Sequence, residues 1–438
     1  MEDFREQLKV KKERAILVGA ILRGQERVDD NLVELTALTE SAGAIVADRF
    51  QQRLYKIKPS TYIGSGKAKM LADRVHRYEA DVVIFDNDLS PGQIRELENI
   101  IEVKVLDRSE LILDIFATRA KTRQAKLQVE LAQLEYTYPR LTRMWSHLDT
   151  VAGAAGGAGA IGAVGGIGTR GTGEKQLEID RRLVNKRITE LKRDLTGIDK
   201  RKLREINGRK GIFKVSLVGY TNAGKSTLMN TLTDAGVLVE DRLFATLDTR
   251  TKKWAVEGGV EVLLSDTVGF ISRLPHQLVA SFKATLEEAV NADLLLHVVD
   301  VSSDEAYAQI ESVEKVLAEI GCGEKDMVVL LNKADVLGNA NMLESLQTVY
   351  PDAICISAKT GMDIDKVARI VLDRYRGGDV VVRVTTHMRD GRLQSYLRSS
   401  TEILSENYTD SHVIIEARLG KNQLHILKQH KPEDLEIL

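Results

Sequence analysis

Residues 219–226 have the composition of a loop that binds phosphate. The run Gly219-Tyr-Thr-Asn-Ala-Gly-Lys-Ser226 follows a strand-like stretch at 212–218 and precedes a helical stretch that begins at Thr227. Glycine lets the chain bend so that successive backbone amides point at a phosphate, and the helix N-terminus adds the positive end of its dipole. We therefore expect a nucleotide loop in which Lys225 contacts the β- and γ-phosphates and the Ser226 hydroxyl binds Mg²⁺.

A second motif, Asp266-Thr-Val-Gly269, follows the strand-like run 262–265. Asp266 is placed to hold the Mg²⁺ shell, and the Gly269 amide can sense the γ-phosphate. Between the two motifs lies Thr246, our candidate for a threonine whose binding to the metal depends on the γ-phosphate. Lys225, Thr246 and Gly269 form the predicted catalytic set, and Ser226, Thr246 and Asp266 the predicted metal ligands. Thr249 and Thr251 are alternatives to Thr246.

The base is expected to be read at residues 332–335, Asn-Lys-Ala-Asp, which follow the strand-like run 327–331. The Asp335 carboxylate can accept from both N1–H and the exocyclic amine of guanine, and a buried carboxylate left unpaired by adenine would be costly. Ser357-Ala-Lys359 would supply an amide to guanine O6, or would simply cap a helix. The predicted GTP contacts are Gly219, Tyr220, Thr221, Asn222, Ala223, Gly224, Lys225, Ser226, Thr227, Asp266, Gly269, Asn332, Lys333, Asp335, Ser357, Ala358 and Lys359.

Phe270 stands where many signalling GTPases carry a glutamine that orients water, and an apolar ring cannot polarise water. Slow hydrolysis by the isolated protein is the expected consequence. Asn222 is a candidate for helping to bind K⁺ beside the phosphates; the alternative is a bond to the loop backbone. The run Gly64-Ser-Gly-Lys67 resembles part of a phosphate loop but lacks the full spacing and the following hydroxyl residue.

The chain's length of 438 residues calls for several domains, because one core rarely serves more than about 200 residues. Its 43% apolar and 29% charged residues are typical of a folded globular protein, and no segment has the apolar length of a membrane span. We expect a cytoplasmic protein. Two cysteines, Cys322 and Cys355, are too few for a disulfide framework.

Residues 1–108 read as a small parallel α/β domain. Apolar runs at 15–22, 44–46, 81–85 and 103–106 alternate with amphipathic stretches of helical length. Ser90 before Pro91 is a good helix start and predicts a helix over 91–100.

Residues 109–210 show two long helical patterns, which predict an antiparallel helical hairpin. The second pattern has apolar residues spaced alternately by four and three positions, which is the spacing of a coiled-coil seam: Val184, Ile188, Leu191, Leu195 and Ile198. Residues 127–134 show the same spacing and belong to a first helix, which we expect to end before Pro139. Between them, residues 151–173 hold ten glycines and six alanines. Such a loop is either a recognition tip or a plain flexible linker.

The second arm of this hairpin is basic. Residues 170–214 carry fifteen Lys or Arg against seven Asp or Glu, in a chain of net charge −2. A basic stripe favours a nucleic-acid partner, and a solvated helix face is the alternative. Beyond it, we expect a Ras-like P-loop domain at 211–378 and a small α+β module at 379–438. The module reads as β-α-β-β, with elements at 380–384, 393–404, 412–417 and 424–427.

The chain resembles the HflX family of translation-associated GTPases over nearly all its length. The resemblance is carried by short motifs: Tyr62-Ile-Gly-Ser-Gly66, Leu89-Ser-Pro-Gly-Gln93, Ile112-Leu-Asp-Ile-Phe-Ala117, Leu127-Gln-Val-Glu-Leu131, Gly166-Ile-Gly-Thr-Arg-Gly171, the phosphate loop and Asp266-Thr-Val-Gly-Phe270. It implies GTP hydrolysis, GTP-dependent binding to the large ribosomal subunit and its rRNA and, in some members, splitting of stalled or idle ribosomes under stress.

The resemblance also implies that the glycine-rich loop reaches the peptidyl-transferase region. The predicted ribosome contacts are Gly166, Thr169, Arg170, Gly171, Arg181 and Arg182. Two departures from the family pattern stand out: Asp248 is followed by Thr249 rather than proline, and the glycine loop is rich in alanine. The rival hypotheses are a GTPase acting in RNA modification, for which no second catalytic centre is seen, and an ATP-driven RNA remodeller using the N-terminal domain.

Overall fold

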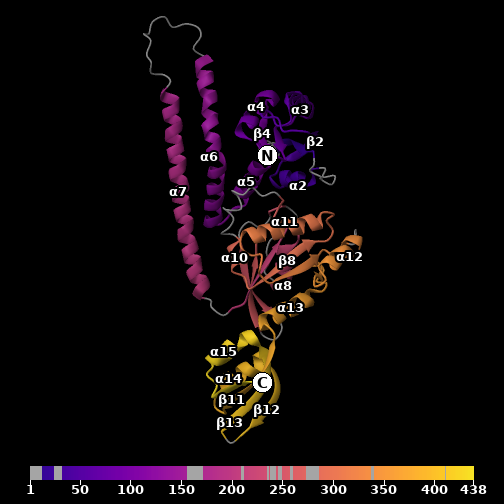
Figure 1. Ribbon diagram of the computed structural model, residues 1–438, viewed down its shortest axis with the longest axis vertical. Helices are drawn as coiled ribbons and strands as arrows, with labels where there is room; N and C mark the ends of the chain where they lie inside the picture. The colour runs from indigo at the N-terminus through magenta and orange to yellow at the C-terminus, as the bar shows by residue number, and fades with distance from the viewer. Residues whose placement is uncertain are drawn as a thin grey trace, which may run out of the picture. The chain divides into compact units, whose positions relative to one another are not determined.

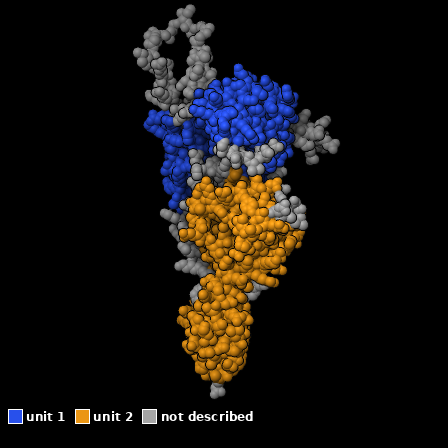
Figure 2. All heavy atoms as spheres, turned by 45° about the vertical axis from the view of Figure 1, so that its right-hand side comes forward, with its two compact units in different colours: residues 1–205, 241–248, 273–284 blue, residues 206–240, 249–272, 285–438 orange. Residues whose placement is uncertain are grey.

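The computed structural model describes most of the chain in two compact units (Figure 1, Figure 2). Unit 1 comprises Met1–Glu205, Asp241–Asp248 and Arg273–Ala284, and unit 2 comprises the remaining residues. The structure describes residues 12–23, 32–154, 171–208, 212–233, 236, 243–244, 249–256, 260–272, 286–336, 340–409 and 411–438. No helix among them is both long and apolar enough to cross a membrane.

Unit 1 begins with the predicted parallel α/β domain. Its sheet has the order β2-β1-β3-β4, with all neighbours parallel. The strands are β1 Arg14–Leu22, β2 Ile45–Leu54, β3 Val82–Phe85 and β4 Lys104–Asp107, and the helices are α2 Val33–Ser41, α3 Ser65–Tyr78, α4 Pro91–Ile101 and α5 Arg108–Arg119. The Ser90 hydroxyl accepts from the Gln93 amide at 3.3 Å, and the Gln93 side chain accepts from the Ser90 amide at 2.9 Å, so α4 begins in a full capping box.

The hairpin is formed by α6 Arg123–Ala154 and α7 Gly171–Gly208, which run antiparallel (Figure 1). Leu191 of the predicted seam is buried. Two ion pairs join the helices, Arg187 to Glu130 at 2.7 Å and Lys192 to Glu135 at 2.8 Å.

The predicted end of the first helix before Pro139 is wrong, because α6 continues through this proline. An interior proline costs about 3 kcal/mol. Contacts on both sides of it offset this cost: the Arg140 guanidinium lies 2.9 Å from an Asp107 carboxylate oxygen and 3.7 Å from the centre of the Tyr136 ring. The Tyr136 hydroxyl also donates to Asp107 at 2.5 Å. These bonds fix α6 to the end of β4.

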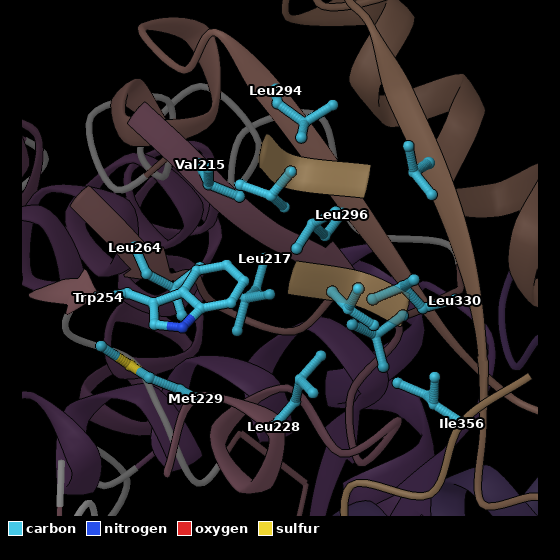
Figure 3. Close-up of a cluster of buried hydrophobic side chains, with 14 of the residues drawn as sticks. Val215, Leu217, Leu228, Met229, Trp254, Leu264, Leu294, Leu296, Leu330 and Ile356 are labelled. Atoms are coloured by element: carbon cyan, nitrogen blue, oxygen red, sulfur yellow. The ribbon is translucent and has the colours of Figure 1, made fainter. Parts of the chain in front are cut away.

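Unit 2 contains a six-stranded sheet of order β10-β9-β8-β5-β7-β6, in which only the β6–β7 pair is antiparallel. The strands are β5 Lys214–Gly219, β6 Arg250–Val256, β7 Val260–Asp266, β8 Leu294–Asp300, β9 Met327–Asn332 and β10 Ile354–Cys355. The helices are α8 Lys225–Thr233, α10 Glu287–Val290, α11 Ala306–Glu319, α12 Ala340–Val349 and α13 Ile364–Arg376. Figure 3 shows side chains of β5, β7, β8 and β9 packed with Leu228, Met229 and Trp254 in its core.

The C-terminal module of unit 2 is an antiparallel sheet of order β12-β13-β11-β14 with short helices. Its elements are β11 Asp379–His387, α14 Gly391–Ser400, β12 Glu402–Tyr408, β13 His412–Gly420, η2 Lys421–Gln423, α15 Leu424–Gln429 and β14 Asp434–Ile437. The strand predicted at 424–427 is helical, because a short apolar run does not distinguish strand from helix. The helix predicted at 393–404 covers α14 and the start of β12.

Candidate nucleotide-binding site

The phosphate loop joins β5 to α8, as the sequence predicts, and two of its glycines could not be replaced. Gly219 has φ +147°, and a Cβ there would lie 2.2 Å from the Val298 carbonyl oxygen of β8. Gly224 has φ +97°, and its Cβ would lie 2.3 Å from Asn332 Nδ2. The loop therefore takes a path that only glycine allows, close against β8 and the start of the guanine motif.

Lys225 is buried at the first turn of α8, with 6% of its surface exposed. Its ammonium group donates to the carbonyls of Gly219 at 3.0 Å and Tyr220 at 2.8 Å. Burial lowers the pKa of Lys225 to about 8, an effect that the Asp266 carboxylate partly opposes. The lysine is thus held inside the loop, where bound phosphates would restore its full charge.

Nucleotide affinity should fall as the pH rises through 8. The pKa of Lys225 is about 8 in the free protein, and bound phosphate should raise it. Below pH 8 the lysine is already charged and nucleotide binding is favoured; above pH 8 the protein must take up a proton when the nucleotide binds. We expect GDP affinity to fall about fourfold between pH 7 and 8.5. Calorimetry at pH 8.5 in buffers of different ionisation enthalpy should report the proton uptake, and buffer-independent heats would contradict the assignment.

Two of the three predicted magnesium ligands, Ser226 and Asp266, lie together at the first turn of α8. The Ser226 hydroxyl donates to the Asp266 carboxylate at 2.6 Å, and Asp266, at the end of β7, is fully buried. A hydroxyl and a carboxylate are the hard oxygen donors that suit Mg²⁺, which takes its other ligands from water and phosphates. The pair fits this ion, whose charge would draw the phosphate oxygens toward the loop.

Residues 269 and 270 lie directly against the phosphate loop. A Cβ at Gly269 would lie 2.6 Å from Thr221 Cα and 3.1 Å from Lys225 Nζ. The Phe270 amide donates to the Gly219 carbonyl at 3.1 Å, and its carbonyl accepts from the Thr221 amide at 2.7 Å. The Tyr220 hydroxyl also accepts from the Ser272 amide at 2.7 Å. The backbone after Asp266 is therefore tied to the phosphate loop.

Asn332 is a buried link between the two halves of the site. Its side-chain amide donates to the Ala223 carbonyl at 2.8 Å and accepts from the Ala358 amide at 2.9 Å. The guanine motif, the phosphate loop and the Ser357-Ala-Lys359 turn are thus held in one fixed arrangement.

Asp335 is exposed at the edge of this arrangement, in the place predicted for reading guanine. One of its carboxylate oxygens accepts from the Ser357 hydroxyl at 2.7 Å. Lys333 has φ +65°, and its ammonium lies 2.5 Å from Asp300 at the end of β8. These bonds orient the Asp335 carboxylate and the Lys333 ammonium.

Hydrogen bonds and close backbone approaches join the phosphate loop to Gly269 and Asn332, and Asn332 to the turn at Ala358. Asn222 is exposed with φ +61°, Thr227 lies in α8 and Lys359 is exposed. Thr246, Gly166, Thr169 and Arg170 lie outside the described residues. Gly171 begins α7, and Arg181 and Arg182 lie on that helix.

Asp300 and His297 are site neighbours that the sequence motifs did not identify. The only sequence signal for Asp300 is its position as an acidic residue at the end of an apolar strand-like run. His297 is buried on β8, and burial, with the charge of Lys225, lowers its pKa to about 4, so it is neutral beside the loop.

Three family models match successive stretches: "GTP-binding GTPase N-terminal" at residues 29–117, "GTP-binding GTPase Middle Region" at 119–209 and "50S ribosome-binding GTPase" at 214–333. A GTP-binding protein from the hyperthermophilic archaeon Sulfolobus solfataricus, solved with GDP, aligns over 83% of this chain and 98% of its own, with TM-score 0.45 and 24% identity.

Two curated relatives match most of the chain. The GTPase HflX of Lacrimispora saccharolytica is 40% identical over 414 residues, 94% of each chain. The GTPase HflX of Escherichia coli strain K12 is 41% identical over 386 residues, 87% of this chain and 88% of its own. The chain therefore belongs to the HflX family of GTPases, which bind and hydrolyse GTP.

Proposed function

We propose that this GTPase binds the large ribosomal subunit in its GTP-bound state and splits or rescues ribosomes under stress. The family model that covers residues 214–333 is described as a 50S ribosome-binding GTPase. The observation on this chain that supports the proposal is the basic helix α7. Mg²⁺ held by Ser226, Asp266 and Thr246 is part of this proposal, as is K⁺ near Asn222.

The charge on α7 is only partly used within the protein. Arg187 and Lys192 pair with acidic residues of α6, and Arg182 pairs with Glu178 at 2.6 Å, an exposed pair that contributes little stability. Lys186 and Arg193 are exposed and form no ion pair with the described residues. These two side chains are free to contact phosphates of rRNA.

Lys186→Gln combined with Arg193→Gln should weaken binding to large subunits and reduce its dependence on salt. Each lost phosphate contact should lower the slope of log affinity against log salt by about one. Lys69→Gln combined with Arg77→Gln, on exposed positions of α3, removes the same charge elsewhere. GDP affinity should stay unchanged in both variants. Equal ribosome affinity and salt slope in the α7 variant and the wild type would remove α7 from the interface.

A further inference from the structure

The C-terminal module separates its charges between its sheet and its helices. The strands β11, β12, β13 and β14 together hold six Asp or Glu residues and two Arg residues. The helices α14, η2 and α15, with the turns that follow them, occupy residues 391–401 and 421–432 and hold five Lys or Arg residues and no Asp or Glu. The surface of a soluble domain usually mixes charges of both signs. A surface built without any acidic residue therefore indicates a partner of negative charge.

Helices α14 and α15 lie side by side on one face of the sheet (Figure 1). Leu393 and Leu397 of α14 and Leu427 of α15 are fully buried in the core of the module. The ring of Tyr396 on α14 stacks on that of His430, which follows α15, with the ring centres 4.9 Å apart. Both helices therefore present their exposed residues on one surface, which we call the helical layer and define as residues 391–401 and 421–432.

Most cations of the helical layer have no counter-charge within the protein. Arg398 pairs with Glu406 at 2.5 Å. The other four are exposed, and their side chains form no ion pair or hydrogen bond with any residue that the structure describes: Arg392, Lys421, Lys428 and Lys431. Positive side chains gathered on one surface without acidic neighbours create a potential that attracts a polyanion.

The opposite face of the sheet is not suited to RNA. The module has the order β-α-β-β-α-β, and RNA-binding modules with a four-stranded sheet stack bases on aromatic side chains of the sheet. Here the residues that alternate with the buried ones form ion pairs instead. The Arg383 guanidinium lies 2.8 Å from a Glu416 carboxylate oxygen and 2.9 Å from one of Glu436. Arg418 lies 3.1 Å from Glu402, so three carboxylates outnumber two guanidinium groups and would repel phosphates.

We propose that the helical layer binds the phosphates of RNA through its four unpaired cations. The identity of this RNA rests on the proposed ribosome-binding function, which makes it rRNA of the large subunit. Lys and Arg side chains that contact phosphates fix the position of a protein on nucleic acid but do not read its sequence. The helical layer therefore adds affinity and salt dependence to ribosome binding and holds the C-terminal module against the subunit.

The test compares full-length variants that lose equal charge in different places. Arg392→Gln combined with Lys428→Gln removes one cation from each helix of the helical layer. Lys315→Gln combined with Arg369→Gln is the matched control, because it removes two exposed cations from α11 and α13. The layer variant should bind rRNA extracted from large subunits about tenfold more weakly, with the slope of log affinity against log salt reduced by about two. The control variant should match the wild type, and Arg392→Lys with Lys428→Arg should restore binding.

The same proteins are also titrated with large subunits in a non-hydrolysable GTP analogue, while GDP affinity and circular dichroism check the nucleotide site and the folding. Equal binding of extracted rRNA by the layer and control variants, or no such binding by the wild type, would overturn the proposal. Weaker binding to subunits with unchanged binding to extracted rRNA would indicate an acidic protein partner and would also overturn it. If the wild type binds extracted rRNA through the helical layer but does not bind subunits, the proposed ribosome function fails and the RNA-binding surface stands.

Discussion

Asp335→Asn is expected to weaken GTP binding roughly a hundredfold and to admit xanthosine nucleotides. A hydrogen bond to a charged group contributes about 1.5–3 kcal/mol; the bond to the exocyclic amine is lost and the bond to N1–H is no longer charged, and about 2.7 kcal/mol corresponds to a hundredfold. The variant keeps an amide oxygen that can accept from N1–H, but it places an amide donor against the exocyclic amine of guanine, where xanthine presents an oxygen acceptor. The Ser357 hydroxyl, 2.7 Å from Asp335, keeps the new side chain in the same place.

Titration with fluorescent GTP, GDP and xanthosine nucleotides measures this change of base preference. Asp365→Asn, an exposed position of α13, makes the same chemical change away from the site and should alter nothing. Equal GTP affinity in Asp335→Asn and the wild type would show that another residue reads the base.

GTP hydrolysis by the isolated protein should be slow and should rise on the order of a hundredfold with large ribosomal subunits. Phe270 is 2% exposed, and its backbone is bonded to the phosphate loop, so this position offers no polar side chain to orient water. We expect a partner to complete the site. Phosphate release at fixed GTP, with and without large subunits, measures the stimulation.

Lys225→Met is the control for this assay, because it removes the phosphate-binding lysine and exposes any GTPase carried over with the ribosomes. Small subunits at equal concentration test for a general RNA effect. If the protein alone hydrolyses GTP fast, at a rate that large subunits do not change, then no partner is needed to complete the hydrolysis site.

The nucleotide site could be predicted from the sequence because its motifs are local and their order fixes their place. Strand, glycine loop and helix are contiguous at 214–233, and Asp266 and Asn332 each end a strand of the same sheet. Parallel strands present their carboxyl ends at one edge, so short motifs after β5, β7 and β9 must converge. The fold class follows from the same alternation of apolar runs and helices.

What could not be predicted depends on contacts between distant residues. Pro139 would end an isolated helix, and the contacts of Tyr136 and Arg140 with Asp107 explain why α6 continues. Nothing near Phe244 in the sequence indicates its contact with the ring of Phe116, whose centre lies 4.6 Å away and which comes over a hundred positions earlier in the chain. The domain boundaries at 108, 210 and 378 stay predictions.

Sedimentation with purified large ribosomal subunits in GTP, GDP and a non-hydrolysable GTP analogue tests the central claim most directly. The protein should sediment with the subunits in the analogue, less in GTP as hydrolysis proceeds, and least in GDP, because GDP lacks the γ-phosphate to which Thr246 and the Gly269 amide are proposed to respond. The same experiment with whole 70S ribosomes shows whether the protein separates the two subunits. Sedimentation that is equal in all three nucleotides, or absent in the analogue, would contradict a GTP-dependent ribosome-binding switch.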